Sequence, residues 1–89
     1  MRLIPGFILR EVADTLIAVP SGPAAHKLSG LLEMNGSAKL LFELLQENRT
    51  EEELLEALLQ TYDTDKATAQ TDLREILEQL ANNGLLIAE

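Results

Sequence analysis

The pattern of apolar positions changes its period once, at the turn Asn35-Gly36. Before this turn, the residues up to Met34 form a short apolar run in which Glu33 is the only charge, as is typical of a strand. After the turn, apolar residues recur at the spacing of a helix, at Ala38, Leu41, Leu44 and Leu45. The sequence therefore predicts that a strand passes directly into a helix over residues 30–46, with Asn35 as the helix cap.

Two apolar or β-branched runs near the N-terminus predict a β-hairpin. They cover Phe7 to Val12 and Thr15 to Val19, and the two residues between them, Ala13-Asp14, match the length of a tight turn. Residues 2–6 are expected to be irregular, because Pro5 lacks an amide donor.

The region between the hairpin and the central turn has two parts. Residues 21–29 show no periodicity and contain Gly22 and Pro23, so they are expected to form a mobile connection. Leu28 to Met34 is then predicted as the third strand of a small antiparallel sheet.

A second helix is predicted to begin at Thr50. Thr50 and Glu53 have the spacing of a capping box, in which each side chain accepts a hydrogen bond from a backbone amide of the other. The apolar stripe of this helix consists of Leu54, Leu55, Leu58, Leu59 and Tyr62.

The third and longest helix is predicted over about Lys66 to Asn83. Asp65 is suited to cap its start, and Gly84 stands where a left-handed residue commonly ends a helix. Its apolar residues recur at three and four positions, at Ala69, Leu73, Ile76, Leu77 and Leu80. The apolar tail, residues 85–87, is expected to pack on the core or to add a short strand.

The order of these elements predicts an α+β, winged-helix-like fold, with an N-terminal three-stranded antiparallel sheet followed by a three-helix bundle. The chain has 89 residues, a length that favours one domain, 1–89, with a modest core. No apolar run approaches the ~20 residues of a membrane span, and the first residues lack the pattern of a signal peptide, so a cytoplasmic location is expected.

Composition narrows the possible chemistry. Cysteine is absent and His26 is the single histidine, so disulfides, thiol catalysis and the usual zinc sites are excluded, and no metal or cofactor is expected. The net charge of −8 repels phosphate backbones and disfavours nucleic acid as a partner. No nucleophile-base pair or phosphate-binding glycine loop is present, so an enzyme is the least favoured class.

Five segments, taken in their order and spacing, resemble the PqqD family, the coenzyme PQQ synthesis protein D group. They are residues 33–45 (EMNGSAKLLFELL), Thr50-Glu-Glu-Glu-Leu54, Tyr62-Asp63, Asp72-Leu73 and residues 80–86 (LANNGLL). The predicted hairpin, Phe7 to Pro20, also fits the start of this family. One departure is Phe42, where members of the family often carry tryptophan.

The resemblance implies a non-catalytic adaptor in the biosynthesis of ribosomally made, modified peptides or of a PQQ-like cofactor. Such domains bind the leader segment of a precursor peptide and present it to a modifying enzyme, often a radical SAM protein. The leader adds as a strand beside the third strand, in a groove walled by the third helix. The resemblance places the strand contacts on Leu31, Leu32, Glu33 and Met34 and the wall on Ala69, Asp72, Leu73 and Ile76.

These residues have a physical rationale and a simpler alternative. An unpaired strand edge offers amides and carbonyls to an extended peptide. Leu31, Leu73 and Ile76 could accept apolar anchors of the leader, while Glu33 and Asp72 could select a basic residue. The alternative is that the leucines are core residues and that Asp72 is solvated.

Two further questions stay open at the level of sequence. A winged-helix DNA-binding regulator has the same architecture, although the third helix offers only Lys66 and Arg74 as basic residues. The chain could act as a monomer, or as a strand-exchanged homodimer if residues 21–29 let the hairpin swap between copies.

Overall fold

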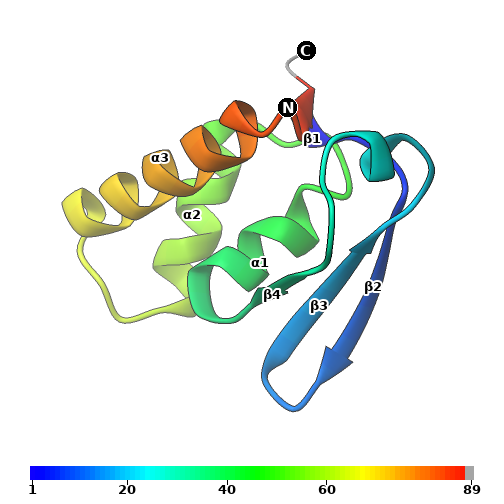
Figure 1. Cartoon of the computed structure of the whole chain (residues 1–89). Coiled ribbons are helices and arrows are strands. Elements are labelled where there is room, and N and C mark those ends of the chain that lie inside the picture. The colour runs from blue at the N-terminus through cyan, green and yellow to red at the C-terminus, as the bar shows by residue number, and fades with distance from the viewer. Residues whose placement is uncertain (88–89) are drawn as a thin grey trace.

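The computed structural model describes residues 1–87, which form a small antiparallel sheet and three helices (Figure 1). The sheet has the spatial order β2-β3-β4, in which β2 is Phe7–Val12, β3 is Thr15–Pro20 and β4 is Leu32–Met34. It is followed by α1 (Gly36–Leu44), α2 (Glu51–Thr61) and α3 (Lys66–Asn82). The predicted α+β fold is therefore confirmed. The expected domain extends to residue 89, and its last two residues lie outside the described part.

The predicted hairpin is present, with the predicted turn. The register pairs Val12 with Thr15, which leaves Ala13 and Asp14 as the turn residues. Ala13 has a φ of 55°, the left-handed conformation that two-residue hairpin turns favour. Pro20 ends β3, as expected.

The two ends of the chain form a second, two-stranded sheet. The structure pairs β1 (Arg2–Leu3) with β5 (Leu86–Ile87), so the expectation that residues 2–6 are irregular is wrong for Arg2 and Leu3. Both outcomes expected for the tail occur, because Leu86 and Ile87 form the strand while Leu85 is buried in the core. A two-residue strand shows no periodicity in the sequence, and its partner lies at the other end of the chain, so local pattern could not reveal the pairing.

The connection expected over residues 21–29 contains a 3-10 helix, Gly22–His26, which buries Ala24 completely. At its start, the amide and the hydroxyl of Ser21 both donate to the carbonyl of Gly6, at 2.7 and 2.8 Å. A Cβ on Gly6 would lie 2.2 Å from the carbonyl oxygen of Ser21, so this close approach requires glycine. The third strand is correspondingly shorter than Leu28 to Met34.

The helix caps agree with the sequence except at Asn35. Thr50 and Glu53 form the reciprocal capping box, at 2.9 and 3.1 Å, and Asp65 accepts from the amide of Thr68 at 2.7 Å. These backbone hydrogen bonds, from Thr50 and Thr68, lower the pKa of Glu53 and of Asp65. Asn35 is the N-cap residue of α1, but its side chain makes no capping hydrogen bond.

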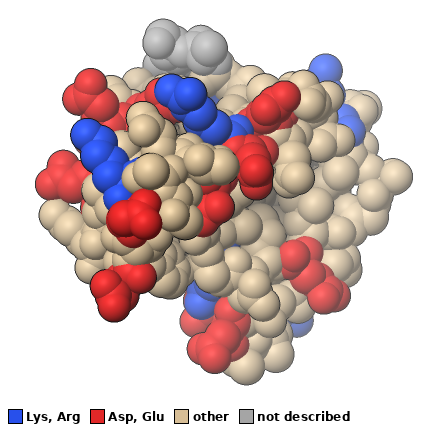
Figure 2. Space-filling model, turned by 90° about the vertical axis from the view of Figure 1, so that its left-hand side faces the viewer, with Lys and Arg blue, Asp and Glu red and all other residues tan. Residues whose placement is uncertain are grey.

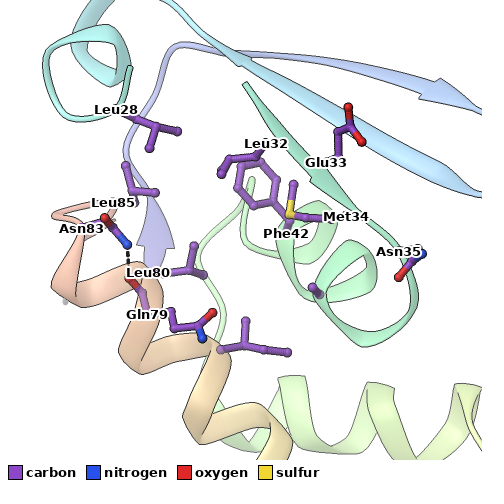
Figure 3. A pocket seen from close by; sticks show the side chains of 12 residues that line it. Leu28, Leu32, Glu33, Met34, Asn35, Phe42, Gln79, Leu80, Asn83 and Leu85 are labelled. Atoms are coloured by element: carbon purple, nitrogen blue, oxygen red, sulfur yellow. Dashed lines mark hydrogen bonds between the residues drawn. The ribbon is translucent and has the colours of Figure 1, made fainter. Parts of the chain in front are cut away.

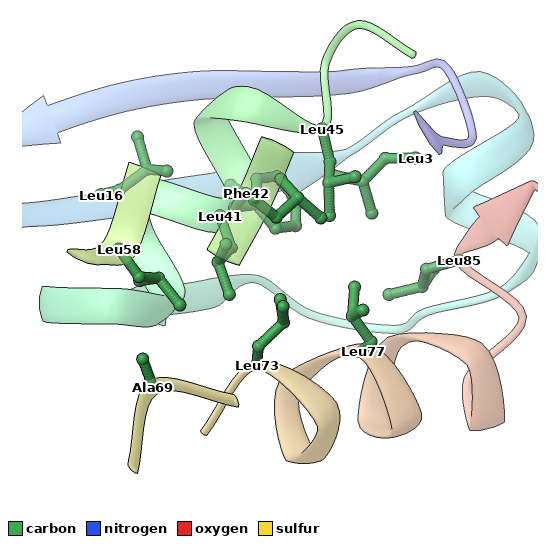
Figure 4. Close-up of a cluster of buried hydrophobic side chains, with 12 residues drawn as sticks. Leu3, Leu16, Leu41, Phe42, Leu45, Leu58, Ala69, Leu73, Leu77 and Leu85 are labelled. Carbon is green, nitrogen blue, oxygen red and sulfur yellow. The ribbon is translucent and has the colours of Figure 1, made fainter. Parts of the chain in front are cut away.

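The core lies where the helices meet the inner face of the sheet and the terminal strands (Figure 4). Phe42 is at its centre, and its ring meets the ring of Phe7 edge to face, with centroids 5.0 Å apart. Tyr62, expected in the stripe of α2, instead follows that helix and is 36% exposed. The buried apolar residues are Leu3, Leu16, Ala18, Ala24, Leu41, Phe42, Leu45, Leu54, Leu58, Ala69, Leu73, Leu77 and Leu85.

Candidate functional site

One long side of β4 has no partner strand. β4 pairs with β3 through Leu16↔Met34, Ile17↔Glu33 and Ala18↔Leu32. Within residues 1–87 no other strand pairs with β4, so its second edge is open. Such an edge presents backbone groups that can pair with another chain.

The hairpin register determines which backbone groups of β3 point toward β4. Hydrogen-bonded and non-hydrogen-bonded pairs alternate along an antiparallel ladder. The amide of Ser21 donates to the carbonyl of Gly6 at the base of the hairpin, so every second pair from there is bonded between β2 and β3. Leu16 and Ala18 belong to the intervening pairs. Their N–H and C=O groups therefore point toward β4.

The same alternation continues on β4 and leaves Glu33 facing outward. Leu32 and Met34 lie opposite Ala18 and Leu16, so they use their backbone groups on β3. The N–H and C=O of Glu33, between them, point to the open side. Glu33 therefore offers a donor and an acceptor to an added strand.

A groove of about 360 Å³ runs between this edge and the C-terminal half of α3 (Figure 3). The side chains of Leu32 and Met34 point into it, whereas the carboxylate of Glu33 points away. The interior is apolar, while Asn35, Gln79 and Asn83 bring amide groups to it. The lining consists of Leu28, Leu32, Glu33, Met34, Asn35, Ala38, Phe42, Ile76, Gln79, Leu80, Asn83 and Leu85.

The helical wall of the groove is one face of α3 and of the turn that ends it. Ile76, Gln79, Leu80 and Asn83 have the spacing i, i+3, i+4 and i+7, which places them on one side of a helix. The side-chain amide of Asn83 donates to the carbonyl of Gln79 at 2.8 Å, which holds the end of the wall in place. Gly84 follows with a φ of 71° and turns the chain into Leu85.

The structure brings together only part of the predicted site. Leu32, Glu33, Met34 and Ile76 all line the groove, while Leu31 precedes β4 and is 52% exposed. Ala69 and Leu73 are instead buried, at 2% and 0% exposure. Asp72 and Ala69 line a different depression, with Ser37, Leu58, Tyr62 and Thr64.

The wall lies closer to the C-terminal end of α3 than predicted, because the N-terminal half packs on the rest of the bundle. Ala69, Leu73 and Leu77 form the stripe that faces the core, and Ile76 and Leu80 form a second stripe beside it. The extension from Ile76 to Leu80 could have been found from the spacing alone. Leu28, Phe42 and Leu85 reach the groove only through tertiary packing, and no local signal marks them.

Charge is distributed unequally around this site. Residues 1–35 contain three basic side chains, Arg2, Arg10 and Lys27, and three acidic ones, so the entire net charge of −8 belongs to the remainder of the chain. Figure 2 shows red acidic side chains spread over the face that lies to the left in Figure 1. Among residues 1–87 no group of three or more metal-ligating side chains is assembled. None of the helices in this part combines the length and apolar character needed to cross a membrane.

Comparison with known proteins supports one family. The model of the family described as coenzyme PQQ synthesis protein D (PqqD) matches residues 20–86. No curated protein sequence gives a significant match.

Two solved structures have a similar fold. One is TbiB1 in complex with the TbiA(beta) leader peptide, with a TM-score of 0.77, 23% identity and complete coverage of both chains. The other is lasso peptide synthetase B1 complexed with the leader peptide, with a TM-score of 0.72 and 16% identity, covering 98% of this chain and 96% of that one.

Proposed function

Because the chain belongs to the PqqD family, we propose that it is a non-catalytic adaptor for a ribosomally synthesised precursor peptide. In this proposal it binds the leader segment and presents the rest of the peptide to a modifying enzyme. The observation that carries the proposal is the open edge of β4 beside an apolar groove. Two proteins of similar fold have been solved in complex with leader peptides, which supports a leader peptide as the ligand.

The leader would bind as a fourth strand of the sheet. One leader residue would exchange two hydrogen bonds with the outward N–H and C=O of Glu33. Because side chains alternate along a strand, the leader residues on either side of it would point into the groove, toward Leu32 and Met34. We therefore expect a leader motif in which two apolar side chains are separated by one residue.

The energetics assign most of the affinity to these apolar side chains. A backbone hydrogen bond contributes about 1 kcal/mol net, whereas a micromolar complex requires about −8 kcal/mol after the costs of association. Burying one leucine-sized side chain contributes about 1.5–3 kcal/mol. Two or three apolar anchors in the groove would therefore supply what the strand edge cannot.

The peptide-binding residues predicted above take different roles in this proposal. Leu32, Met34 and Ile76 would contact the leader in the groove, Glu33 would bind its backbone, and Leu31 would extend the contact at the exposed start of the edge. Ala69 and Leu73 would support the wall from inside the core. Asp72, in the separate depression, would act on a basic leader residue only if the leader extends along α3.

The wider setting follows from the same proposal. The modifying enzyme is expected to be a radical SAM protein on the family resemblance, and the similar lasso peptide synthetase B1 offers a second pathway in which to look for it. The adaptor would act in the cytoplasm, where ribosomes release the precursor. It would act as a monomer, because exchange of hairpins is not needed to complete the groove.

Binding of a leader peptide tests the function directly. Leader segments of short precursor genes beside this gene would be titrated by calorimetry, and we expect a micromolar or tighter complex with one of them. Absence of binding by every such leader would contradict the adaptor function.

Two substitutions of Glu33 test the proposed binding mode. Glu33→Pro removes only an outward amide, because the ladder with β3 uses Leu32 and Met34, and proline is tolerated at such edge positions. We expect it to lower affinity about tenfold, since one hydrogen bond and the local strand geometry are lost. Glu33→Ala, the matched control, keeps the amide and should bind within about threefold of the original chain. Equal affinities for the two variants would argue against strand addition at this edge.

A further inference from the structure

The outer face of the sheet carries exposed apolar side chains that no other element of residues 1–87 covers. Residues alternate between two faces along each strand, and Leu16 and Ala18 point inward to the core. Their neighbours point outward, where Ile8 is 60%, Val12 53% and Val19 41% exposed. Ile8 and Val19 lie directly opposite each other in the register, so they form one continuous patch.

The sequence of β3 is that of a strand covered on both faces. Its central residues, Leu16 to Val19, are all apolar, whereas a strand with one solvated face shows an apolar-polar alternation. β2 begins in the same way, with Phe7, Ile8 and Leu9. In the structure the helices cover only the inner face, so the second apolar face has no partner among residues 1–87.

The sheet side of the molecule presents less net charge to a protein partner than the helical side does. Residues 1–35 have no net charge, whereas the helical part of the molecule carries all of the net charge of −8. On the outer face Ile17 lies between Arg10 of β2 and Glu33 of β4, which are its neighbours in the strand register. Within the described residues neither Arg10 nor Glu33 forms an ion pair. A protein partner with an apolar surface and a carboxylate opposite Arg10 would match this face.

The area of the outer face indicates whether a partner would bind it alone or only together with a bound leader. Six-residue strands rise about 20 Å, and the sheet spans about 10–15 Å, which gives a footprint on the order of 200–300 Å². A specific protein interface buries about 800 Å² per partner. The face is therefore too small for a stable complex by itself, including a complex with a second copy. A guest strand on β4 would extend the same face with its own outward side chains.

We propose that the outer face of the β2-β3-β4 sheet is the docking surface for the peptide-modifying enzyme, and that a leader bound at β4 completes it. This inference rests on the proposed leader binding. The enzyme would contact Ile8, Val12 and Val19 together with the outward side chains of the leader. It would thus bind the loaded adaptor tightly and the empty adaptor weakly, which prevents empty adaptors from occupying the enzyme.

The test compares Ile8→Lys and Val19→Thr with Thr71→Lys. Thr71 is exposed on α3, away from both the groove and the sheet, so Thr71→Lys adds the same charge as Ile8→Lys at a remote site. Val19→Thr retains a β-branched residue and should fold even if a charge in the hairpin does not. The probes are the leader identified by calorimetry and the modifying enzyme encoded beside the gene.

Leader affinity is measured first and separately, and all three variants should bind the leader within about twofold of the original chain. If the original chain binds no leader, the proposed function fails before the docking surface is tested. Enzyme binding to the loaded adaptor is then measured by surface plasmon resonance. We expect it to weaken at least tenfold in Ile8→Lys, several-fold in Val19→Thr and not at all in Thr71→Lys.

Three results would overturn the proposal. The first is an unchanged enzyme affinity of loaded Ile8→Lys. The second is an equal affinity of the enzyme for loaded and empty adaptor. The third is a dimer of the original chain at about 100 µM in analytical ultracentrifugation that Ile8→Lys converts to monomer. That outcome would assign the face to a second copy of the chain.

Discussion

Helix α3 carries two adjacent apolar stripes that differ in what covers them. Leu73 and Leu77 point into the core and are at most 9% exposed, whereas Ile76 and Leu80 border the groove and are half-buried (Figures 3 and 4). The residue types and spacings of the two stripes are alike. The comparison shows that an apolar stripe can serve stability or binding, and that the neighbouring elements decide which.

The largest expected effect is on the stripe of α3 that faces the core, Leu73 and Leu77, here called the sealed stripe. Leu73→Ala should lower the free energy of unfolding by about 2–5 kcal/mol, because it leaves a cavity among fully buried side chains. Urea denaturation followed by circular dichroism measures this loss. The same experiment on Leu80→Ala should give a clearly smaller value, since that side chain is already partly exposed. Equal losses would show that the two stripes are not distinct.

The next largest effect is expected on leader affinity, when the stripe that borders the groove, Ile76 and Leu80 (the open stripe), is changed. Ile76→Ala and Leu80→Ala should each weaken leader binding by about 10–100-fold, which corresponds to the loss of about 1.5–3 kcal/mol of apolar burial. Calorimetry with the same leader measures this change. Leu55→Ala, on the half-buried surface of α2 outside the groove, is the control and should leave leader affinity unchanged. A comparable loss in the control would indicate that Ile76 and Leu80 act only through general stability.

A smaller effect is expected at the end of the wall. Asn83→Ala removes the hydrogen bond to the carbonyl of Gln79, which should cost about 1 kcal/mol of stability or less and weaken leader binding a few-fold. Asn82→Ala is the matched control. It removes the neighbouring exposed side-chain amide, which forms no hydrogen bond within residues 1–87. Indistinguishable variants would remove Asn83 from the site.

The smallest effect concerns the cap that both stripes share. The backbone hydrogen bond from Thr68 lowers the pKa of Asp65 in the folded state below its ordinary value of 3.8. The stabilisation that the ionised Asp65 cap gives the folded state is therefore complete above pH 3.8. It is lost as the pH falls through the lower folded pKa. Asp65→Asn keeps a capping oxygen but does not titrate, so its stability should fall less between pH 6 and pH 3.

Urea denaturation at the two pH values measures that difference. The decrease in the free energy of unfolding between pH 6 and pH 3 should be the same in the original chain and in Leu80→Ala. The cap and the groove residue are distant, so their effects add. A steeper acid loss in Asp65→Asn than in the original chain would contradict the role of this cap.

Local chemistry made much of the fold predictable. Thr50 with Glu53, Asp65 and Gly84 marked helix ends, because capping and left-handed turns depend on residues close in sequence. The period change at Asn35-Gly36 located the junction of β4 and α1 for the same reason. Four of the eight predicted peptide-binding residues, namely Leu32, Glu33, Met34 and Ile76, line the groove. That they bind a peptide stays a prediction.

The features that were missed depend on distant parts of the chain. Pairing of Arg2–Leu3 with Leu86–Ile87 joins the two ends, and the wall position was misjudged because Ala69 and Leu73 face the bundle. Leu28 reaches the groove from the segment that follows the 3-10 helix, and Leu85 from the tail that follows α3. None of these contacts leaves a periodic signal.

The sequence by itself determined the hairpin, the position of the third strand and the three α-helices, where most of these helices begin and end, and that the helical part carries the negative charge. Each of these follows from neighbouring side chains and the backbone they adjoin. Tertiary structure alone decided which apolar stripe of α3 is sealed, which sheet edge adjoins a groove, and that the backbone of Glu33 faces outward. The physical reason is that burial and strand pairing are properties of surfaces brought together by folding, and equal apolar patterns become core or binding site according to what packs against them.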